Sequence, residues 1–515
     1  MVLARGIVLC AWIVLSTQPG AVQDNAAVAA LLREAQRLAL AGRLDAAQKT
    51  VEKVLARKPE STTALVALGE ILEARADLPG AVVAYERAVR AGPENAVAHD
   101  KLGFALGRQD RVPEALTAFA RAIEIDPDLF EAQYHLGATR WWTRDLAGAE
   151  APLRAAVRLQ PRHPEARYYL GLTLRQLGRV DEAIDQLAEA VRLAPALAPA
   201  RLQLGVALQA SGDLDGAIVH LQRAVTLDPA SPEALNSLGL ALMQKGRGTE
   251  AADTFRTLVS SHPAFPAGRL NLATALIHQG DLTTAVEILR ELTADEPRNA
   301  EAFYNLGVAL KQRDDFAKAE EALRRAMSLD AGLTDAPFTL GVLLWQTGRT
   351  EEAEAAFREA VARKADSPDA HYMLGTVLEQ QGQRDKAIDQ FRAAIGFRAD
   401  MAEAHQSLAQ ALRQKGNADG ARNAQAEADR LNRRKADAQA STFAVSVGEQ
   451  KLKAGNRAGA IAQFREAIRL ARDNPQAHYA LALALEQAGS LAEARRHFDE
   501  AQRLAPHLRR PEPGK

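Results

Sequence analysis

The sequence is poor in cysteine, in aromatic residues and in net charge, and each shortage narrows what the protein can be. It has one cysteine, 5% aromatic residues, and 64 Lys plus Arg against 65 Asp plus Glu. A single thiol excludes an internal disulfide and a thiolate metal site. Balanced charge provides no field to attract nucleic acid or an anionic membrane, so we expect no nucleic-acid partner. Few aromatic residues beside many alanines favour helices over strands.

Long apolar runs are also missing. The longest one, Gly6 to Leu15, follows Arg5 and precedes the small and turn-forming residues Ser16 to Ala21. Ten residues are too few to span a bilayer, and the order charged, apolar, small is typical of a signal peptide. We therefore expect residues 1–21 to be a signal peptide, and the mature protein to be periplasmic or secreted, without a transmembrane span or a thiol. An uncleaved anchor is the alternative.

The chain does contain a repeat of 34 residues. A glycine or alanine recurs at this interval without a slip from the first unit to the twelfth, and the pattern resumes after five inserted residues. The fourteen positions are Ala35, Gly69, Gly103, Gly137, Gly171, Gly205, Gly239, Ala273, Gly307, Gly341, Gly375, Ala409, Gly448 and Ala482. An alanine follows twelve residues later in all fourteen units, which start near Val28 and end near Leu508.

The departures from this pattern predict the domain organisation. Residues 28–435 form twelve repeats, 436–440 an insertion, 441–508 two further repeats and 509–515 a tail. The twelfth unit has Gln425 in its large apolar slot, and residues 422–440 contain no Gly or Pro that would end a helix. We interpret this stretch as an overlong helix and a joint. Its arginines suggest a basic patch as an alternative, but interleaved Glu427, Asp429 and Asp437 favour a solvated face.

The repeat resembles the tetratricopeptide repeat, whose motif is seen in one unit as Phe303, Leu306, Gly307, Leu310, Ala319, Leu323 and Ala326. The resemblance covers about residues 28–508. It implies an all-α fold in which each unit is an antiparallel pair of helices, A and B, stacked into a right-handed superhelical solenoid. The residues agree, because Ala302, Leu306 and Leu310 form an apolar stripe. Small residues at 307 and 319 allow close helix packing, and Ser231 and Ser367 stand where helix N-caps are expected.

Motifs for catalysis are missing. The sequence has no phosphate-binding glycine-rich loop, no nucleophile elbow and no paired-histidine zinc helix. We expect a non-enzymatic protein without a cofactor or a metal site. His99, His371, His405 and His478 occupy the same slot in different units. We interpret them as a repeated structural contact.

The resemblance implies that the fifth, ninth and twelfth residues of each helix A face the concave side. Aromatic residues gather there, and they offer a large contact area for recognition. The fifth-position tyrosines also suit packing, so both interpretations of them stay open. The candidate partner-binding residues are Tyr134, Trp141, Trp142, Tyr168, Tyr169, Tyr304, Phe338, Trp345 and Tyr372.

These patterns predict a scaffold that binds a peptide or protein partner in the concave groove, outside the cytoplasm. A periplasmic component of an exopolysaccharide or outer-membrane assembly or export system is the second interpretation, because tryptophan and tyrosine also stack on sugars. An enzyme is the third. Asn271 and Asn305 match the asparagine slot of the family's carboxylate clamp for chaperone tails, but the cationic residues of that clamp are missing. That function is not carried over.

Overall fold

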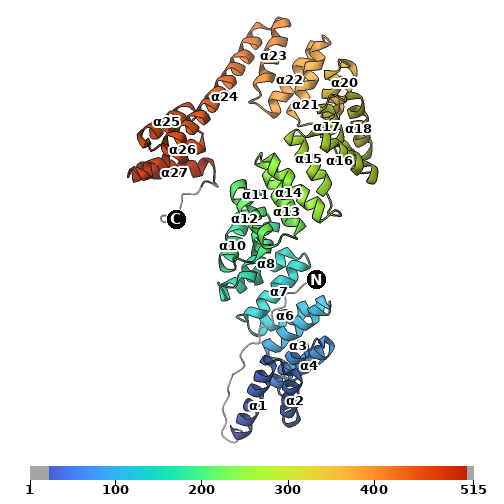
Figure 1. Cartoon of the computed structure of the whole chain (residues 1–515), viewed down its shortest axis with the longest axis vertical. Coiled ribbons are helices and arrows are strands. Elements are labelled where there is room, and N and C mark those ends of the chain that lie inside the picture. Colours follow the sequence, from blue (N-terminus) through green and yellow to red (C-terminus); the bar gives the residue numbers. More distant parts are fainter. Residues whose placement is uncertain (1–21, 507, 509–515) are drawn as a thin grey trace. The chain divides into compact units, whose positions relative to one another are not determined.

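The computed structural model describes residues 22–506 and residue 508, which form 27 helices and, within that range, no strand (Figure 1). The predicted all-α solenoid of tandem helix pairs is confirmed. The expected signal peptide at residues 1–21 and the tail at residues 509–515 lie outside the described residues. Within the described part, no helix combines the length and the apolar character needed to cross a bilayer.

The described chain divides into two compact units, one with α1 to α12 and the other with α13 to α27. The helices of the first unit are α1 (Val22–Leu40), α2 (Leu44–Arg57), α3 (Thr62–Ala74), α4 (Leu78–Ala91), α5 (Ala96–Arg108), α6 (Val112–Ile125), α7 (Phe130–Trp142), α8 (Leu146–Leu159), α9 (Pro164–Gln176), α10 (Val180–Leu193), α11 (Ala198–Ser211) and α12 (Leu214–Leu227). Those of the second are α13 (Pro232–Gln244), α14 (Gly248–Ser261), α15 (Gly268–Gln279), α16 (Leu282–Asp295), α17 (Ala300–Gln312), α18 (Phe316–Leu329), α19 (Asp335–Gln346), α20 (Thr350–Arg363), α21 (Pro368–Gln380), α22 (Arg384–Phe397), α23 (Ala402–Gln414), α24 (Ala418–Lys453), α25 (Arg457–Leu470), α26 (Pro475–Gln487) and α27 (Leu491–Leu504).

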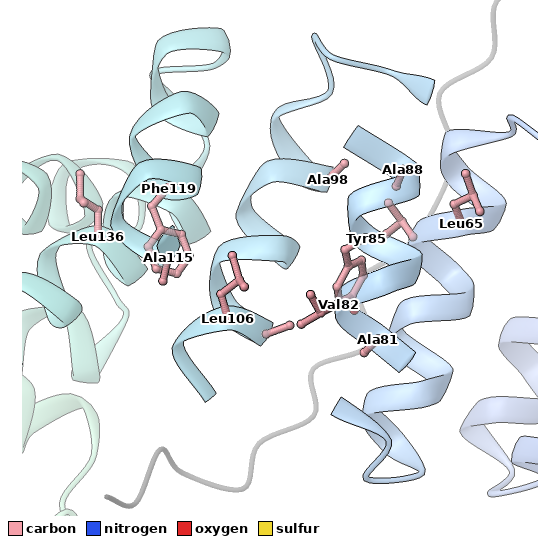
Figure 2. Close-up of a cluster of buried hydrophobic side chains, with 12 residues drawn as sticks. Leu65, Ala81, Val82, Tyr85, Ala88, Ala98, Leu106, Ala115, Phe119 and Leu136 are labelled. Carbon is pink, nitrogen blue, oxygen red and sulfur yellow. The ribbon is translucent and has the colours of Figure 1, made fainter. Parts of the chain in front are cut away.

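The small residues of the repeat mark the closest approach of helices A and B. A Cβ atom on Gly307 would lie 2.6 Å from Cγ of Leu323 and 3.2 Å from the carbonyl oxygen of Ala319, which is itself fully buried. The same contact recurs in the first unit, where Gly69 lies against Tyr85. Figure 2 shows the surrounding core, in which side chains from α3 to α7 form one continuous cluster. The predicted reason for mid-helix glycine is therefore confirmed.

Helix starts also follow the prediction. The hydroxyl of Ser231 accepts a hydrogen bond from the backbone N–H of Ala234 at 3.1 Å, and Ser367 accepts one from Ala370 at 3.4 Å. These side chains satisfy N–H groups that have no partner within the helix. They fix the start of helix A in their repeats and thereby the direction of its side chains.

The predicted overlong helix is confirmed as α24, which joins the B helix of repeat twelve to the A helix of repeat thirteen (Figure 1). Residues 432–440 are exposed throughout. Within each compact unit a B helix otherwise packs on the next A helix, but here the two are one helix. Among the described residues, α23 and α25 do not touch. One helix alone therefore links the last two repeats to the preceding ones.

Candidate functional site

Seven of the nine candidate residues lie at the fifth or twelfth position of a repeat, and Tyr169 and Trp142 lie beside them at the sixth and thirteenth positions. We call the surface formed by the fifth, sixth, ninth, twelfth and thirteenth positions of the A helices the A-helix stripe. Where neighbouring repeats meet on this surface, contacting residues are 35 positions apart, one more than the repeat length. A fifth-position side chain contacts the sixth position of the next repeat, as in Asp100 with His135 at 2.8 Å and Tyr304 with Thr339 at 3.4 Å. The sixth and thirteenth positions therefore belong to the same surface. The sequence pattern identified only Tyr169 and Trp142 of these.

Repeats four and five bring five of the predicted residues together. The ring of Trp141 lies 5.0 Å from that of Trp142 and 5.5 Å from that of Tyr169, both edge to face. Tyr169 also contacts Tyr168 at 5.3 Å and Tyr134 at 6.1 Å. Such pairs contribute about 0.5–1.5 kcal/mol each beyond their burial. The cluster therefore holds its rings in fixed positions.

Burial separates these residues into two groups. Trp142 is 55% exposed, whereas the other predicted residues are half-buried. Tyr134, Trp141 and Tyr169 pack against a core cluster that includes Leu170 and Leu174. Trp141 therefore takes part in the packing between repeats, because its ring lies against α9. Tyr168 and Tyr372 pack against core clusters as well.

Some polar atoms near this aromatic cluster have a hydrogen-bond partner in the chain, and others have none. The Tyr134 hydroxyl donates to Glu165 at 3.2 Å, and burial together with that carboxylate raises the pKa of Tyr134. Burial raises the pKa of Tyr168 to about 12. In the second unit Trp345 Nε1 donates to Gln380 Oε1 at 3.0 Å. The corresponding atoms in repeats four and five, Trp141 Nε1 and Gln176 Oε1, are buried without a hydrogen-bond partner.

Hollows follow the stripe in the second unit. One of about 480 Å³ lies between repeats eight and nine, lined by Thr274, Ile277, His278, Tyr304, Asn305, Val308 and Gln312. A second, of about 340 Å³, includes Tyr304 and Phe338 in its wall. Trp345 and Tyr372 line neither hollow. The amide of Asn271 donates to Asn236 at 2.8 Å and that of Asn305 to the Glu301 carbonyl at 3.1 Å, so both are engaged within the chain.

The four histidines that share a slot make the repeated contact predicted for them. In each case Nε2 lies 2.9–3.0 Å from the backbone carbonyl oxygen six residues earlier, which ties helix A to the preceding loop. Gln133 makes the same contact at 2.9 Å. In the part of the chain that the structure describes, no group of three or more His, Cys, Asp and Glu side chains is arranged to hold a metal ion.

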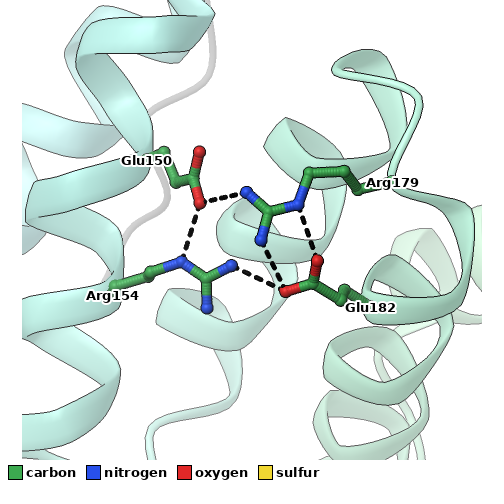
Figure 3. Close-up of polar contacts among 4 residues, drawn as sticks. All are labelled: Glu150, Arg154, Arg179 and Glu182. Atoms are coloured by element: carbon green, nitrogen blue, oxygen red, sulfur yellow. Dashed lines mark hydrogen bonds and ion pairs between the residues drawn. The ribbon is translucent and has the colours of Figure 1, made fainter.

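The B helices carry a different kind of polar surface. Glu150 and Arg154 of α8 meet Arg179, the residue before α10, and Glu182 of α10 in a closed ring of hydrogen bonds, which Figure 3 shows. Arg154 lies 2.8 Å from both carboxylates. The arginines hold the pKa of Glu150 and of Glu182 below its usual range. Each of these four charges has a counter-ion, so the network is internally neutralised.

Comparison with known proteins identifies the repeat. Models described as tetratricopeptide repeat match residues 32–96, 101–161, 141–198, 202–269, 338–402, 372–439 and 448–508 in one case, and 242–309 and 300–332 in two others. No curated protein matches the chain.

Solved structures resemble parts of the chain or most of it. The chain is similar to MamA, with 26% identity and a TM-score of 0.31 over 32% of this chain and 96% of MamA. It is similar to YrrB, described as a TPR protein with an unusual peptide-binding site, with 22% identity and a TM-score of 0.34 over 36% and 96%. Naa15/Naa10 bound to HypK-THB shares 15% identity and a TM-score of 0.31 over 93% and 94%.

Proposed function

This chain belongs to the tetratricopeptide repeat family, which is typically non-catalytic and serves protein interaction, and we propose that its A-helix stripe holds a peptide segment of a protein partner outside the cytoplasm. One observation carries the proposal. Trp141 Nε1 and Gln176 Oε1 are buried polar atoms without a hydrogen-bond partner, and the ring of Trp141 contacts that of Trp142, which is 55% exposed. Buried polar groups in proteins are nearly always hydrogen-bonded. A bound ligand would supply the missing partners.

A peptide suits this surface better than a purely apolar ligand. An extended backbone presents N–H and C=O groups in alternation, so it can accept from the Trp141 indole and donate to the Gln176 amide. The exposed ring of Trp142 would contribute contact area at a low cost in side-chain entropy. Aromatic residues of this kind dominate the energetics of many protein interfaces.

Photo-crosslinking on the full chain tests the proposal. A crosslinking amino acid at Trp142 is compared with one at Val83, a B-helix residue that is also 55% exposed. We expect a defined partner adduct from a native envelope extract at position 142 and none at 83. Equal yields at both positions, or an adduct at 83 alone, would contradict a binding surface on the A helices.

Export forms a separate part of the proposal. It is supported by the order charged, apolar, small in residues 1–21. The intact mass of the natively expressed protein should correspond to a chain that starts near Val22. A soluble cytoplasmic species that retains Met1 would disprove export, while leaving the binding surface untouched.

A second candidate function is a periplasmic part of an exopolysaccharide or outer-membrane assembly or export system. The edge-to-face rings of Trp141, Trp142 and Tyr169 favour it, because they offer flat faces on which sugars stack. A glycan array and a displayed peptide library, applied to the same protein, separate the two. Binding of oligosaccharides alone, lost on Trp142→Ala, would support this second function over the first.

A further inference from the structure

Two cations on the A-helix stripe lack a counter-ion. Arg175 and Lys311 occupy the twelfth position of repeats five and nine, and both are half-buried. No carboxylate of the described residues lies within ion-pair distance of either, and burial lowers the pKa of each. The stripe's acids differ in this respect. Glu70 pairs with Lys101 at 3.0 Å, and Glu73 lies 3.6 Å from Arg108.

Arg175 also lies near other polar atoms that have no hydrogen-bond partner. Its Nε is buried without a hydrogen-bond partner, as are Trp141 Nε1, Gln176 Oε1 and Gln203 Oε1. Tyr168, Leu172 and Arg175 follow each other at intervals of four and three residues on one face of α9. Two donors, from Trp141 and Arg175, and two acceptors, from Gln176 and Gln203, therefore lie without partners along repeats four to six.

An unpaired guanidinium in this position is unfavourable for the isolated chain. Removing a charge from water without a partner costs free energy that only a counter-ion and hydrogen bonds recover. A guanidinium presents a planar fork that matches a carboxylate in two parallel hydrogen bonds. The missing counter-ion is thus best supplied by a carboxylate of the ligand.

We propose that the segment bound by repeats four to six carries an acidic side chain that pairs with Arg175, next to a large apolar side chain that packs on Trp142 and Tyr168. This inference rests on the proposed function and specifies its ligand. Tyr304, Val308 and Lys311 repeat the arrangement in α17 of the second compact unit. A second acidic contact at Lys311 follows from the same reasoning.

Selection from a library of random twelve-residue peptides tests this. The peptides are displayed without a free C-terminus, so that every carboxylate selected belongs to a side chain. Selections run in parallel on the full chain, on Arg175→Gln and on Arg192→Gln. Arg192 is the matched control, because its side chain is 63% exposed and pairs with Glu189 at 2.6 Å in the same unit.

We expect wild type and Arg192→Gln to enrich Asp or Glu beside an aromatic or aliphatic residue, and Arg175→Gln to lose the acidic preference. In the best peptide, Glu→Gln should weaken binding to wild type by at least about tenfold, the size of one charge-assisted hydrogen bond. The same peptide change should have no effect on Arg175→Gln, which isolates the pair.

Other outcomes separate the inference from the function on which it rests. Peptides without an acidic preference, whose binding still requires Trp142, overturn the inference and leave the proposed function standing. No enrichment, or peptides that bind Trp142→Ala and Arg175→Gln as well as wild type, overturn both. Binding of a uronate oligosaccharide that is lost on Arg175→Gln, without any selected peptide, would overturn the inference by assigning the carboxylate to a glycan.

Discussion

Two charge networks on the B helices and two cations on the A-helix stripe differ in whether they have counter-ions. On the B helices Glu150, Arg154, Arg179 and Glu182 form a closed network. Glu320, Arg324, Arg349 and Glu352 repeat it five repeats later. On the stripe Arg175 and Lys311 have no counter-ion among the described residues. The two networks neutralise their own charges, whereas Arg175 and Lys311 have no carboxylate of the described residues beside them, and this difference is the basis of our proposal that a ligand pairs with them.

The largest expected effect comes from breaking the core on which both surfaces rest. Ala319→Leu should destabilise the fold by about 1–3 kcal/mol, because the residue is fully buried where α17 and α18 meet and a larger side chain overfills the site. Ala317→Leu on the same helix is exposed and serves as the control. Hydrogen exchange should speed up mainly in repeats eight to ten. No local change for Ala319→Leu would contradict the repeat register.

Replacing one arginine on each surface sharpens the comparison. Arg175→Met should raise the free energy of unfolding by about 1 kcal/mol, because it removes an unpaired half-buried charge. Arg154→Met should lower it by up to about 1 kcal/mol, because an exposed ion-pair network is lost. Denaturant unfolding of the two variants measures both. Shifts of the same sign would mean that Arg175 is not an unpaired charge in solution.

A smaller effect is expected from pH at the C-terminal repeat. Nδ1 of His478 lies 2.9 Å from Nδ1 of His497, and His478 Nε2 donates to the Arg472 carbonyl at 3.0 Å. Burial, and then His478, lower the pKa of His497, with Glu493 opposing and Arg465 and Arg496 adding to the shift. The unfolded chain therefore binds more protons, so stability is full above His497's usual pKa of about 6.5 and falls as the pH drops below it.

Repeat eleven provides the matched variant for this test. There His371 pairs with Gln390 at 2.7 Å in the same two slots. His497→Gln recreates that pair and should flatten the pH dependence of unfolding of the last repeats between pH 7 and 5. An unchanged pH dependence in His497→Gln would assign the effect to other groups.

The smallest effect on global stability is expected at the joint. Residues 432–440 of α24 are exposed on all sides and include Arg433, Arg434 and Lys435. Few tertiary contacts hold this stretch, so local opening should be easiest there. Limited trypsin digestion should cut it before any other interior position and leave two folded fragments. A first cut elsewhere would indicate that α24 is as well protected as the helices within the repeats.

The sequence predicted the repeat register well, because only small residues fit where helices A and B of a repeat touch. Gly307 and Ala319 must be small where α17 and α18 touch, and the same demand returns every 34 residues. The overlong helix was predictable for a similar reason, since nothing between Arg422 and Ala440 ends a helix. Both features depend on interactions within one repeat or one helix, so the sequence of that segment is enough to predict them.

The candidate site could be predicted only in part, because it depends on how consecutive repeats meet. The angle between successive A helices places a fifth-position residue against the sixth position of the next repeat, 35 residues away, and no pattern within one unit records this shift. For the same reason the sequence pattern did not identify Gln176 and Gln203. Whether a cation such as Arg175 finds a partner likewise depends on that angle.

Trp142 offers the most direct test of the central claim, that the A-helix stripe binds the partner while the core and the B helices maintain the fold. Binding of a peptide selected on wild type and thermal unfolding are measured on the same Trp142→Ala sample, with Val83→Ala as the equally exposed control. The account predicts a loss of about 2 kcal/mol or more in binding, as for an interface hot spot. It predicts a change within about 0.5 kcal/mol in stability, as for a surface residue. Lower stability with unchanged affinity would show that Trp142 supports the fold and that the partner binds elsewhere.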